Sequence, residues 1–260
     1  MIKATIQLIR NWFDNRIIKR STVTQAEWDA AFASLPLLKG YSKEEKQTLK
    51  KLAILFLDRK VFEGAHGLVV TQAMTLIIAL QACIPILKMT IDAYDGWVSV
   101  IVYPAGFSPE REIMDEFGVH HTVRSHLAGE SWQRGPVVLA WNETAHAGVI
   151  DGHNLVIHEF AHKLDMQTRS ANGFPPLHSD MSSRRWFEVF ARDFEDFQRR
   201  CQRAKRSEID CYGATSPAEF FAVLSEVFFE RPQVIKKHYA DIYTQLKLYY
   251  RQDPLSRLAE

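Results

Sequence analysis

Cysteine is scarce in this chain of 260 residues, which contains only Cys83, Cys201 and Cys211. Their spacing does not match the paired cysteines of a structural zinc site, so a thiolate-bound metal is not expected. Cys201 and Cys211 are close enough in sequence to be bridged. Because the number of cysteines is odd and no metal-type spacing is present, we nevertheless expect all three to be reduced thiols of a cytoplasmic protein.

The chain also lacks a strong net charge and a long apolar run. Its 32 Lys and Arg residues nearly balance 31 Asp and Glu residues, and the net charge of +1 creates no overall field to attract nucleic acid or anionic lipid. The longest apolar stretch, from Met74 to Leu87, is too short to span a membrane and contains Gln81 and Pro85. The N-terminal residues have neither an uncharged signal core nor a small-residue cleavage site. We expect a cytoplasmic protein with no direct nucleic-acid partner and no membrane partner.

Hydropathy patterns indicate many helices and few strands. Thr24 and Glu27 form a candidate capping box, and Ser42 opens a further helix in the same way. Helices are predicted at 1–20, 24–34, 42–62, 69–82, 154–166, 182–200, 216–230 and 233–250. The aromatic residues of the helix at 182–200 are expected to face the core: Trp186, Phe187, Phe190, Phe194 and Phe197. Strands are predicted at 97–103, 121–125 and 136–141, and the last begins with proline, which is typical of a sheet edge. These elements predict an α+β fold that is predominantly helical, with a small sheet.

The most informative segment is His158-Glu159-Phe160-Ala161-His162, which follows an apolar run. The spacing of four places both imidazoles on one face of a helix, one turn apart, where they can bind a single Zn²⁺. Glu159 lies about 100° around the helix from His158, in position to take a proton from a metal-activated water. Two core histidines beside a solvated glutamate would be the alternative, but buried imidazoles without partners are costly. The segment therefore predicts a zinc hydrolase.

Two histidines are too few for a catalytic zinc, which usually has three protein ligands and one position for water. An extended motif of the form HExxHxxGxxH is excluded, because Asp165 and Thr168 stand at the required positions. The other common solution takes a glutamate from a later helix. The downstream candidates are Glu188, Glu195, Glu208, Glu219, Glu226 and Glu230.

The helix predicted at 216–230 carries the strongest of these candidates. Apolar residues cover most of its circumference, and the remaining stripe consists of Glu219, Ala222, Ser225 and Glu226. Small residues between two carboxylates would let this helix approach the motif helix closely. Glu219 is expected to be the third ligand, although Ser216 and Glu219 also match a capping box. Glu226 is either the reserve ligand or an acceptor that orients a histidine.

Three further positions have a functional and a structural interpretation. Asp165 could orient a ligand imidazole or could pair with Lys163 at the surface. Tyr212 could donate a hydrogen bond to the oxyanion formed when water attacks a carbonyl, or could simply pack. Glu143 could hold a substrate amine or cap a loop.

Residues 154–166 and 210–230 resemble the Mlc titration factor A family of bacterial zinc-dependent peptidases, and the similarity covers essentially the whole chain. The resemblance assigns five roles: the metal ligands His158, His162 and Glu219, the general base Glu159, and the active-site tyrosine Tyr212. It also implies a gluzincin-type fold similar to the catalytic domain of anthrax lethal factor. One Zn²⁺ per chain, aminopeptidase activity on peptides and binding to the glucose repressor Mlc are implied as well. The Gly-x-Met-Glu-Asn signature of many gluzincin aminopeptidases is absent.

The motif predicts a zinc-dependent hydrolase, and the resemblance implies an aminopeptidase-like peptidase that also binds Mlc and so modulates sugar phosphotransferase genes. We expect one domain, 1–260, with a helical N-terminal part (about 1–90) and a catalytic part (about 91–260). A peptide substrate is expected to add its backbone to the edge strand near Val137–Trp141. The alternative function is a non-catalytic regulatory protein that titrates a repressor, with zinc as a scaffold.

Overall fold

The structure is a computed structural model that describes residues 2–105, 110–114, 120–124, 129–131, 135–146, 149–168, 170–203 and 207–257. The α-helices are α1 (Ile2–Arg20), α2 (Gln25–Ala33), α3 (Lys43–Arg59), α4 (Gln72–Cys83), α5 (Trp141–His146), α6 (Leu155–Asp165), α7 (Ser183–Arg203), α8 (Pro217–Glu230), α9 (Pro232–His238), α10 (Ala240–Tyr250) and α11 (Pro254–Arg257). Short 3-10 helices are η1 (Pro36–Leu38), η2 (Ile91–Tyr94), η3 (Met166–Thr168) and η4 (Cys211–Ala214). Within the described ranges, no helix is both long and apolar enough to cross a bilayer.

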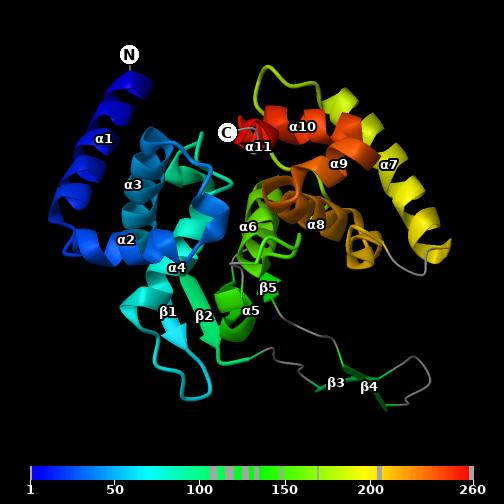
Figure 1. Cartoon of the computed structure of the whole chain (residues 1–260), viewed down its shortest axis with the longest axis horizontal. Helices are drawn as coiled ribbons and strands as arrows, with labels where there is room; N and C mark the ends of the chain where they lie inside the picture. Colours follow the sequence, from blue (N-terminus) through cyan, green and yellow to red (C-terminus); the bar gives the residue numbers. More distant parts are fainter. Residues whose placement is uncertain are drawn as a thin grey trace.

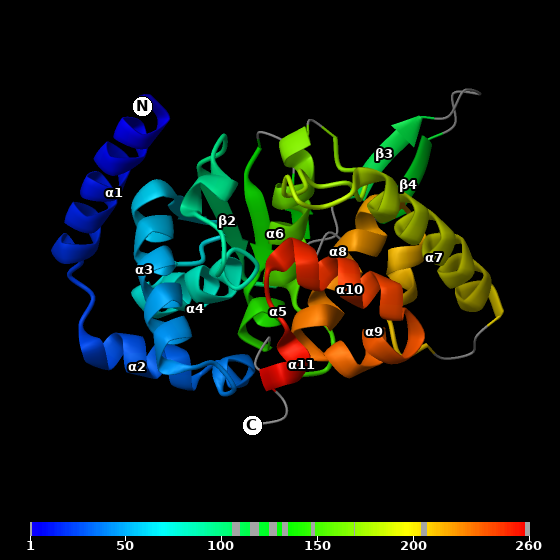
Figure 2. The same ribbon diagram turned by 90° about the horizontal axis from the view of Figure 1, so that it is seen from above.

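The motif helix α6 runs between two groups of helices (Figures 1 and 2). Helices α1 to α4 lie on one side of it, and α7 to α10 lie on the other. Most predicted helices are confirmed in position, with two exceptions. The helix predicted at 42–62 ends at Arg59, because residues 61–64 continue as a strand. The helix predicted at 233–250 is divided at Tyr239, whose φ of −140° is not helical.

Local capping explains where the early helices begin. The Thr24 hydroxyl accepts a hydrogen bond from the Glu27 N–H at 3.3 Å, and the Glu27 carboxylate accepts one from the Thr24 N–H at 2.7 Å. The same reciprocal arrangement joins Ser42 and Glu45 at the start of α3. Both predicted capping boxes are confirmed, and each satisfies backbone N–H groups that the helix leaves free.

Replacing Thr24 with alanine is expected to lower the free energy of unfolding by about 1 kcal/mol, because the first turn of α2 loses its side-chain acceptor. Urea denaturation of the variant and the parent chain measures the difference. Lys51→Ala, on the exposed surface of α3, serves as the control and is expected to change stability far less. An unchanged unfolding midpoint in Thr24→Ala would show that the box contributes nothing.

The main sheet has the strand order β1-β2-β6-β5. Strands β1 (Val61–Gly64), β2 (Ser99–Tyr103) and β6 (Val137–Ala140) are parallel, and β5 (Gly129–Ser131) pairs with β6 in the antiparallel sense. Strands β3 (Glu110–Met114) and β4 (His120–Arg124) form a separate antiparallel pair. The sheet is small beside the helices, as predicted.

The predicted edge position of the strand at 136–141 is wrong, because β6 lies between β2 and β5. Val137 pairs with Val100 on one side and with Ser131 on the other. Pro136 precedes the first residue of β6, so its missing N–H interrupts neither ladder. A peptide therefore cannot add its backbone to Val137–Ala140, and the expected substrate contact at this strand is also wrong.

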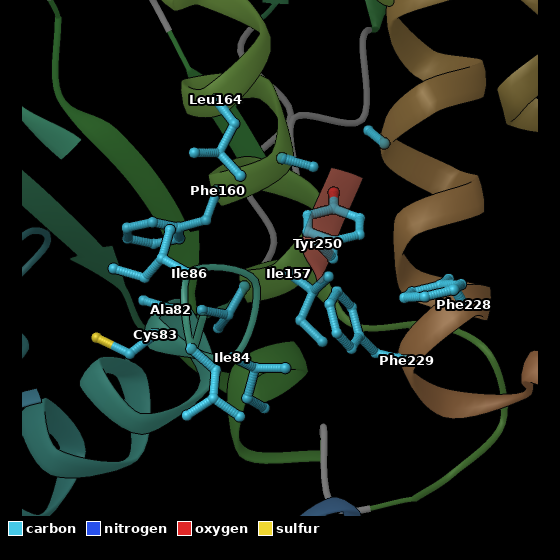
Figure 3. Close-up of a cluster of buried hydrophobic side chains, with 14 of the residues drawn as sticks. Ala82, Cys83, Ile84, Ile86, Ile157, Phe160, Leu164, Phe228, Phe229 and Tyr250 are labelled. Carbon is cyan, nitrogen blue, oxygen red and sulfur yellow. The ribbon is translucent and has the colours of Figure 1, made fainter. Parts of the chain in front are cut away.

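The hydrophobic core fixes the orientation of α6. Its residues Ile157 and Phe160 are fully buried, and Figure 3 shows them in one cluster with Ile86, Phe229 and Tyr250. Burial of one such side chain stabilises the fold by about 1.5–3 kcal/mol. Rotation of α6 would expose these residues, so the opposite face, which carries the two motif histidines, is held toward α8.

Two predictions about α7 and its neighbourhood are wrong. Phe187, expected to face the core together with Trp186, Phe190, Phe194 and Phe197, is 64% exposed. Cys201 and Cys211, expected to be reduced, form a disulfide with a Cα–Cα distance of 5.6 Å, because the last turns of α7 lie beside η4. Cys83 is a free thiol, buried in the core.

Candidate metal centre

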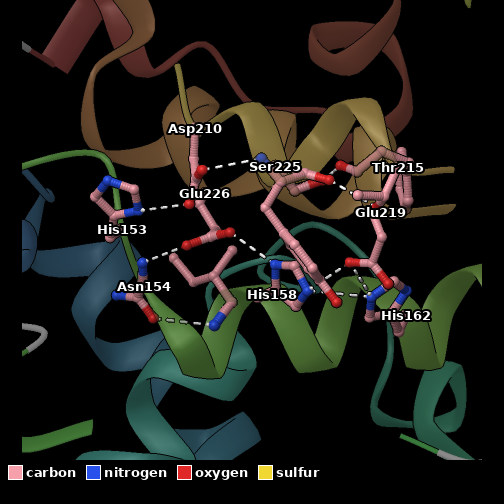
Figure 4. A network of polar contacts seen from close by, with 12 residues as sticks. His153, Asn154, His158, His162, Asp210, Thr215, Glu219, Ser225 and Glu226 are labelled. Atoms are coloured by element: carbon pink, nitrogen blue, oxygen red, sulfur yellow. Dashed lines mark hydrogen bonds and ion pairs between the residues drawn. The ribbon is translucent and has the colours of Figure 1, made fainter. Parts of the chain in front are cut away.

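The motif helix begins at Asn154, whose side-chain oxygen accepts a hydrogen bond from the Ile157 N–H at 3.0 Å. This cap satisfies one of the free N–H groups of the first turn. His158 and His162 follow on the face turned toward α8 (Figure 4). The helix that sequence periodicity predicts at 154–166 is thus present, and it presents both imidazoles to the same neighbouring helix.

Three side chains bring donor atoms to one point. His158 Nε2 lies 3.2 Å from His162 Nε2 and 3.1 Å from Glu219 Oε2. Glu219 Oε2 lies 3.3 Å from His162 Nε2. Donors held about 2.0–2.1 Å from a tetrahedral metal such as zinc lie about 3.3 Å from one another. The three donor atoms therefore match the spacing that one tetrahedral divalent metal requires.

The Glu219 carboxylate points at the histidines and not at Ser216. Ser216 Oγ accepts a hydrogen bond from the Glu219 backbone N–H at 3.2 Å, so the backbone of Glu219 takes part in the cap. Burial alone would raise the pKa of Glu219, but hydrogen bonds from His158 and His162 lower it to about 2. The side chain is consequently a carboxylate at neutral pH, the form in which it can bind a cation.

Glu226 lies on the opposite side of His158 from Glu219. Its Oε1 is 2.7 Å from His158 Nδ1, and its Oε2 accepts a hydrogen bond from the Asn154 N–H at 2.5 Å. Burial acts to lower the pKa of His158, but Glu226 and Glu219 together raise it well above its usual value. When His158 Nδ1–H is donated to Glu226, the lone pair of a neutral imidazole remains on Nε2, which faces Glu219. Glu226 is thus placed as an acceptor for the histidine rather than as a ligand.

Glu159 is almost inaccessible, with 2% of its surface exposed. Its Oε2 atom is buried and has no hydrogen-bond partner among the residues that the structure describes. Burial raises the pKa of Glu159, while His158 and His162 oppose that shift. A buried carboxylate oxygen without a donor calls for an explanation, and a water or cation held at the adjacent donor atoms supplies one.

Tyr212 lies near His158, in η4. Its ring centroid is 6.2 Å from that of His158, and half of the residue, 51%, is exposed. The turn is held by the Asp210 carboxylate, which accepts a hydrogen bond from the Tyr212 N–H at 2.9 Å. Burial of the other half raises the pKa of Tyr212, so its hydroxyl keeps its proton at neutral pH. The structure therefore places the Tyr212 ring near His158, with its hydroxyl in the protonated form.

Residues 9–251 match the model of the glucose-regulated metallo-peptidase M90 family. The chain belongs to this family. It is also similar to proteins called Mlc titration factor A from three bacteria. The protein of Serratia proteamaculans is 37% identical over 90% of each chain, and that of Pectobacterium atrosepticum is 38% identical over 90% of this chain and 89% of its own. The protein of Cronobacter sakazakii is 36% identical over 89% of this chain and 88% of its own.

In this M90 chain Asp165 is the last residue of α6. It is fully buried, and its carboxylate accepts hydrogen bonds from the N–H groups of Gly173 at 2.7 Å and Phe174 at 2.8 Å. His162 Nδ1 is buried and has no partner in the described part of the chain. Asp165 thus ties the loop after α6 to the end of that helix, and a surface pair with Lys163 is wrong.

One further histidine, His153, lies near the site. His153 Nδ1 lies 3.7 Å from Asp210 Oδ2, in the segment just before α6 (Figure 4). The side chain of His146 lies outside the described residues. Glu143 is exposed on α5.

Sequence reasoning missed two residues close to the centre, Asn154 and Glu230. In the sequence, Asn154 is only the first residue of the predicted motif helix, and Glu230 is only one of six downstream glutamates. Both are buried, and an Asn154 side-chain N–H donates to Glu230 at 3.0 Å. The available signal was the asparagine at the N-cap position of the motif helix.

Proposed function

We propose that this M90 chain is a zinc-dependent, aminopeptidase-like peptidase that hydrolyses peptide bonds with a metal-activated water. The observation that carries the proposal is the convergence of the His158, His162 and Glu219 donor atoms, 3.1–3.3 Å apart. They lie beside the buried Glu159, whose Oε2 atom has no partner among the described residues. A structural zinc normally has four protein ligands, whereas three ligands and a neighbouring carboxylate suit catalysis.

In this proposal His158, His162 and Glu219 hold the ion. When bound, zinc supplies a Lewis acid that polarises the scissile carbonyl and makes a nearby water acidic enough to attack at neutral pH. Two nitrogen donors and one carboxylate form a ligand set that zinc accepts in hydrolases. Glu226 supports the set by holding His158 Nδ1.

The remaining chemistry is assigned to Glu159 and Tyr212. Glu159 accepts the proton of the attacking water at its buried carboxylate and then delivers it to the leaving amine. The raised pKa of Glu159 suits the first step, because a carboxylate with a higher pKa takes up a proton more readily. The Tyr212 hydroxyl donates a hydrogen bond to the carbonyl oxygen as negative charge develops there.

Metal removal tests the proposal. Treatment of the protein with a strong chelator is expected to abolish hydrolysis of a peptide library, and addition of Zn²⁺ in slight excess is expected to restore it. Elemental analysis before and after treatment should find about one zinc per chain and then none. Peptides with free and acetylated N-termini, digested side by side, test the aminopeptidase preference. Full hydrolysis in the chelated, zinc-free protein would contradict the proposal.

We further propose that the chain binds the repressor Mlc, because the relatives bear the name Mlc titration factor A. Binding of Mlc can be measured with and without chelator, in parallel with peptide hydrolysis. Binding that survives while hydrolysis stops would mean that the two activities are separate. A chain that binds Mlc and never hydrolyses peptides would support the alternative, in which the protein only titrates a repressor and zinc is a scaffold.

A further inference from the structure

A group of buried polar residues lies behind the metal centre, on the side of His158 away from Glu219. We call the group the Asn154 node, and it consists of Asn154, Gln81, Glu226 and Glu230. All four residues are buried, with 0–6% of their surface exposed. They come from three separate parts of the fold: Gln81 from α4, Asn154 from the start of α6, and both glutamates from α8. Polar groups at such depth are costly unless they are hydrogen-bonded.

The oxygen and the NH₂ group of the Asn154 side chain are both hydrogen-bonded. Its oxygen caps α6 through the Ile157 N–H, and its Nδ2 donates to Gln81 Oε1 and to Glu230 Oε1, each at 3.0 Å. Its backbone N–H donates to Glu226. Asn154 therefore caps the motif helix α6 and connects it to α4 and to α8.

Glu230 holds the same segment from a second direction. Its Oε2 accepts a hydrogen bond from the Gly152 N–H at 2.9 Å. Gly152 has φ +96°, a conformation that residues with a side chain rarely adopt, so the chain is bent there to reach α8. Glu226 and Glu230, one turn apart on α8, thus hold residues 152–154 at two points and fix where α6 begins relative to α8.

The position of α6 relative to α8 determines the distances between the donor atoms of the metal centre, because His158 and His162 lie on α6 and Glu219 lies on α8. A site of this kind requires its donors to be placed within about 0.5 Å. We propose that Asn154 and Glu230 are positioning residues of the metal centre, which act on His158 through Glu226. The inference rests on the proposed metal site, and it extends that site to residues that touch neither metal nor substrate.

Asn154→Ser separates the positioning role from helix capping. Serine is also a good N-cap, and the backbone N–H to Glu226 remains, so only the two Nδ2 hydrogen bonds to Gln81 and Glu230 are lost. The Kd for Zn²⁺, measured by competition with a chromophoric chelator, is expected to rise about tenfold, within the range for residues that orient ligands. The visible absorption bands of the Co²⁺-loaded protein are expected to change in energy or intensity, because the geometry around His158 changes.

Glu230→Gln provides an independent variant with nearly the same shape. Its amide N–H₂ must face one of the two N–H donors, Asn154 or Gly152, so one hydrogen bond is lost and the same shifts in Kd and Co²⁺ spectrum are expected. Thr24→Ala is the control, because it also destabilises the fold but lies at the start of α2, away from the node. Its Kd and Co²⁺ spectrum are expected to match those of the parent chain.

The outcomes are distinguishable. Weaker binding and an altered Co²⁺ spectrum in both node variants, with neither change in Thr24→Ala, would support the positioning role. Parent-like Kd and spectrum in folded Asn154→Ser and Glu230→Gln would overturn this inference and leave the metal site intact. Equal weakening in Thr24→Ala would overturn it as well, because the effect would then be general destabilisation. A parent chain that binds neither Zn²⁺ nor Co²⁺ would overturn the metal site and the inference together.

Discussion

Replacing Glu159 with glutamine is expected to reduce kcat/KM for peptide hydrolysis by roughly 10²- to 10⁴-fold, the contribution typical of a positioned general base. Glutamine has almost the same shape as glutamate, so the buried site beside His158 and His162 should remain packed. It cannot accept a proton at neutral pH, however, and the attacking water would lose its base. Zinc content should stay at about one ion per chain, because Glu159 is not among the three converging donors.

Steady-state kinetics on one peptide, with elemental analysis of the same samples, measures both parts of this expectation. Glu188→Gln is the matched control, because that glutamate is exposed on α7 and pairs with Arg184. It should leave kcat/KM and zinc content unchanged. Near-parental turnover in Glu159→Gln would remove Glu159 from the role of base, whereas loss of zinc would show that it helps to hold the ion.

Glu219→Ala is expected to raise the Kd for Zn²⁺ by more than about 100-fold. Loss of an orienting partner alone costs 10–100-fold in many metal sites, and loss of a ligand should cost more. Glu226→Ala is the natural comparison, because it also removes a carboxylate from α8. The Glu226 carboxylate contacts His158 at Nδ1, on the side of the ring away from Glu219. The Kd of this variant should rise by roughly 10- to 100-fold.

Chelator competition, performed identically on the two variants and the parent chain, gives both constants. The informative result is which of the two variants loses more affinity for Zn²⁺. If Glu219→Ala bound zinc as the parent does and Glu226→Ala did not, the assignment of the third ligand would be reversed. Circular dichroism of each variant excludes unfolding as the source of lost affinity.

The helices that build the site could be predicted from sequence, because their signals are local. Asn154 and Ser216 are N-cap residues, and most residues of α6 and α8 are buried. The pair His158 and His162 could also be identified, since four residues in a helix form one turn. These features depend on the nearest few residues, which the sequence displays directly.

The choice between Glu219 and Glu226 could not be made from spacing. The two residues are seven apart and share one face of α8, so either could meet a histidine. What separates them is the position of α8 along α6, which depends on contacts far apart in sequence, such as Glu226 to Asn154 and Glu230 to Gly152. The helical pattern leaves Glu226 in reserve, and the family resemblance is what raises Glu219 clearly above it.

The incorrect predictions share the same cause. Strand β5 has only three residues, Gly129–Ser131, and no alternation of apolar and polar residues indicates it in the sequence. It nevertheless occupies the sheet edge that was expected for β6. The Cys201–Cys211 pair depends on the chain returning to α7 after its last turn. Such features arise from tertiary packing, and neither composition nor periodicity records them.

Glu219 follows His162, the second motif histidine, by 57 positions in the sequence. At about 5–20 residues per second, a ribosome needs roughly 3–11 s to add that stretch. During this interval the nascent chain carries two of the three donors and lacks the helix that supplies the last one. Under the proposed function, hydrolytic competence is therefore delayed until translation has passed α8, and a nascent chain that still lacks this helix is not yet a protease.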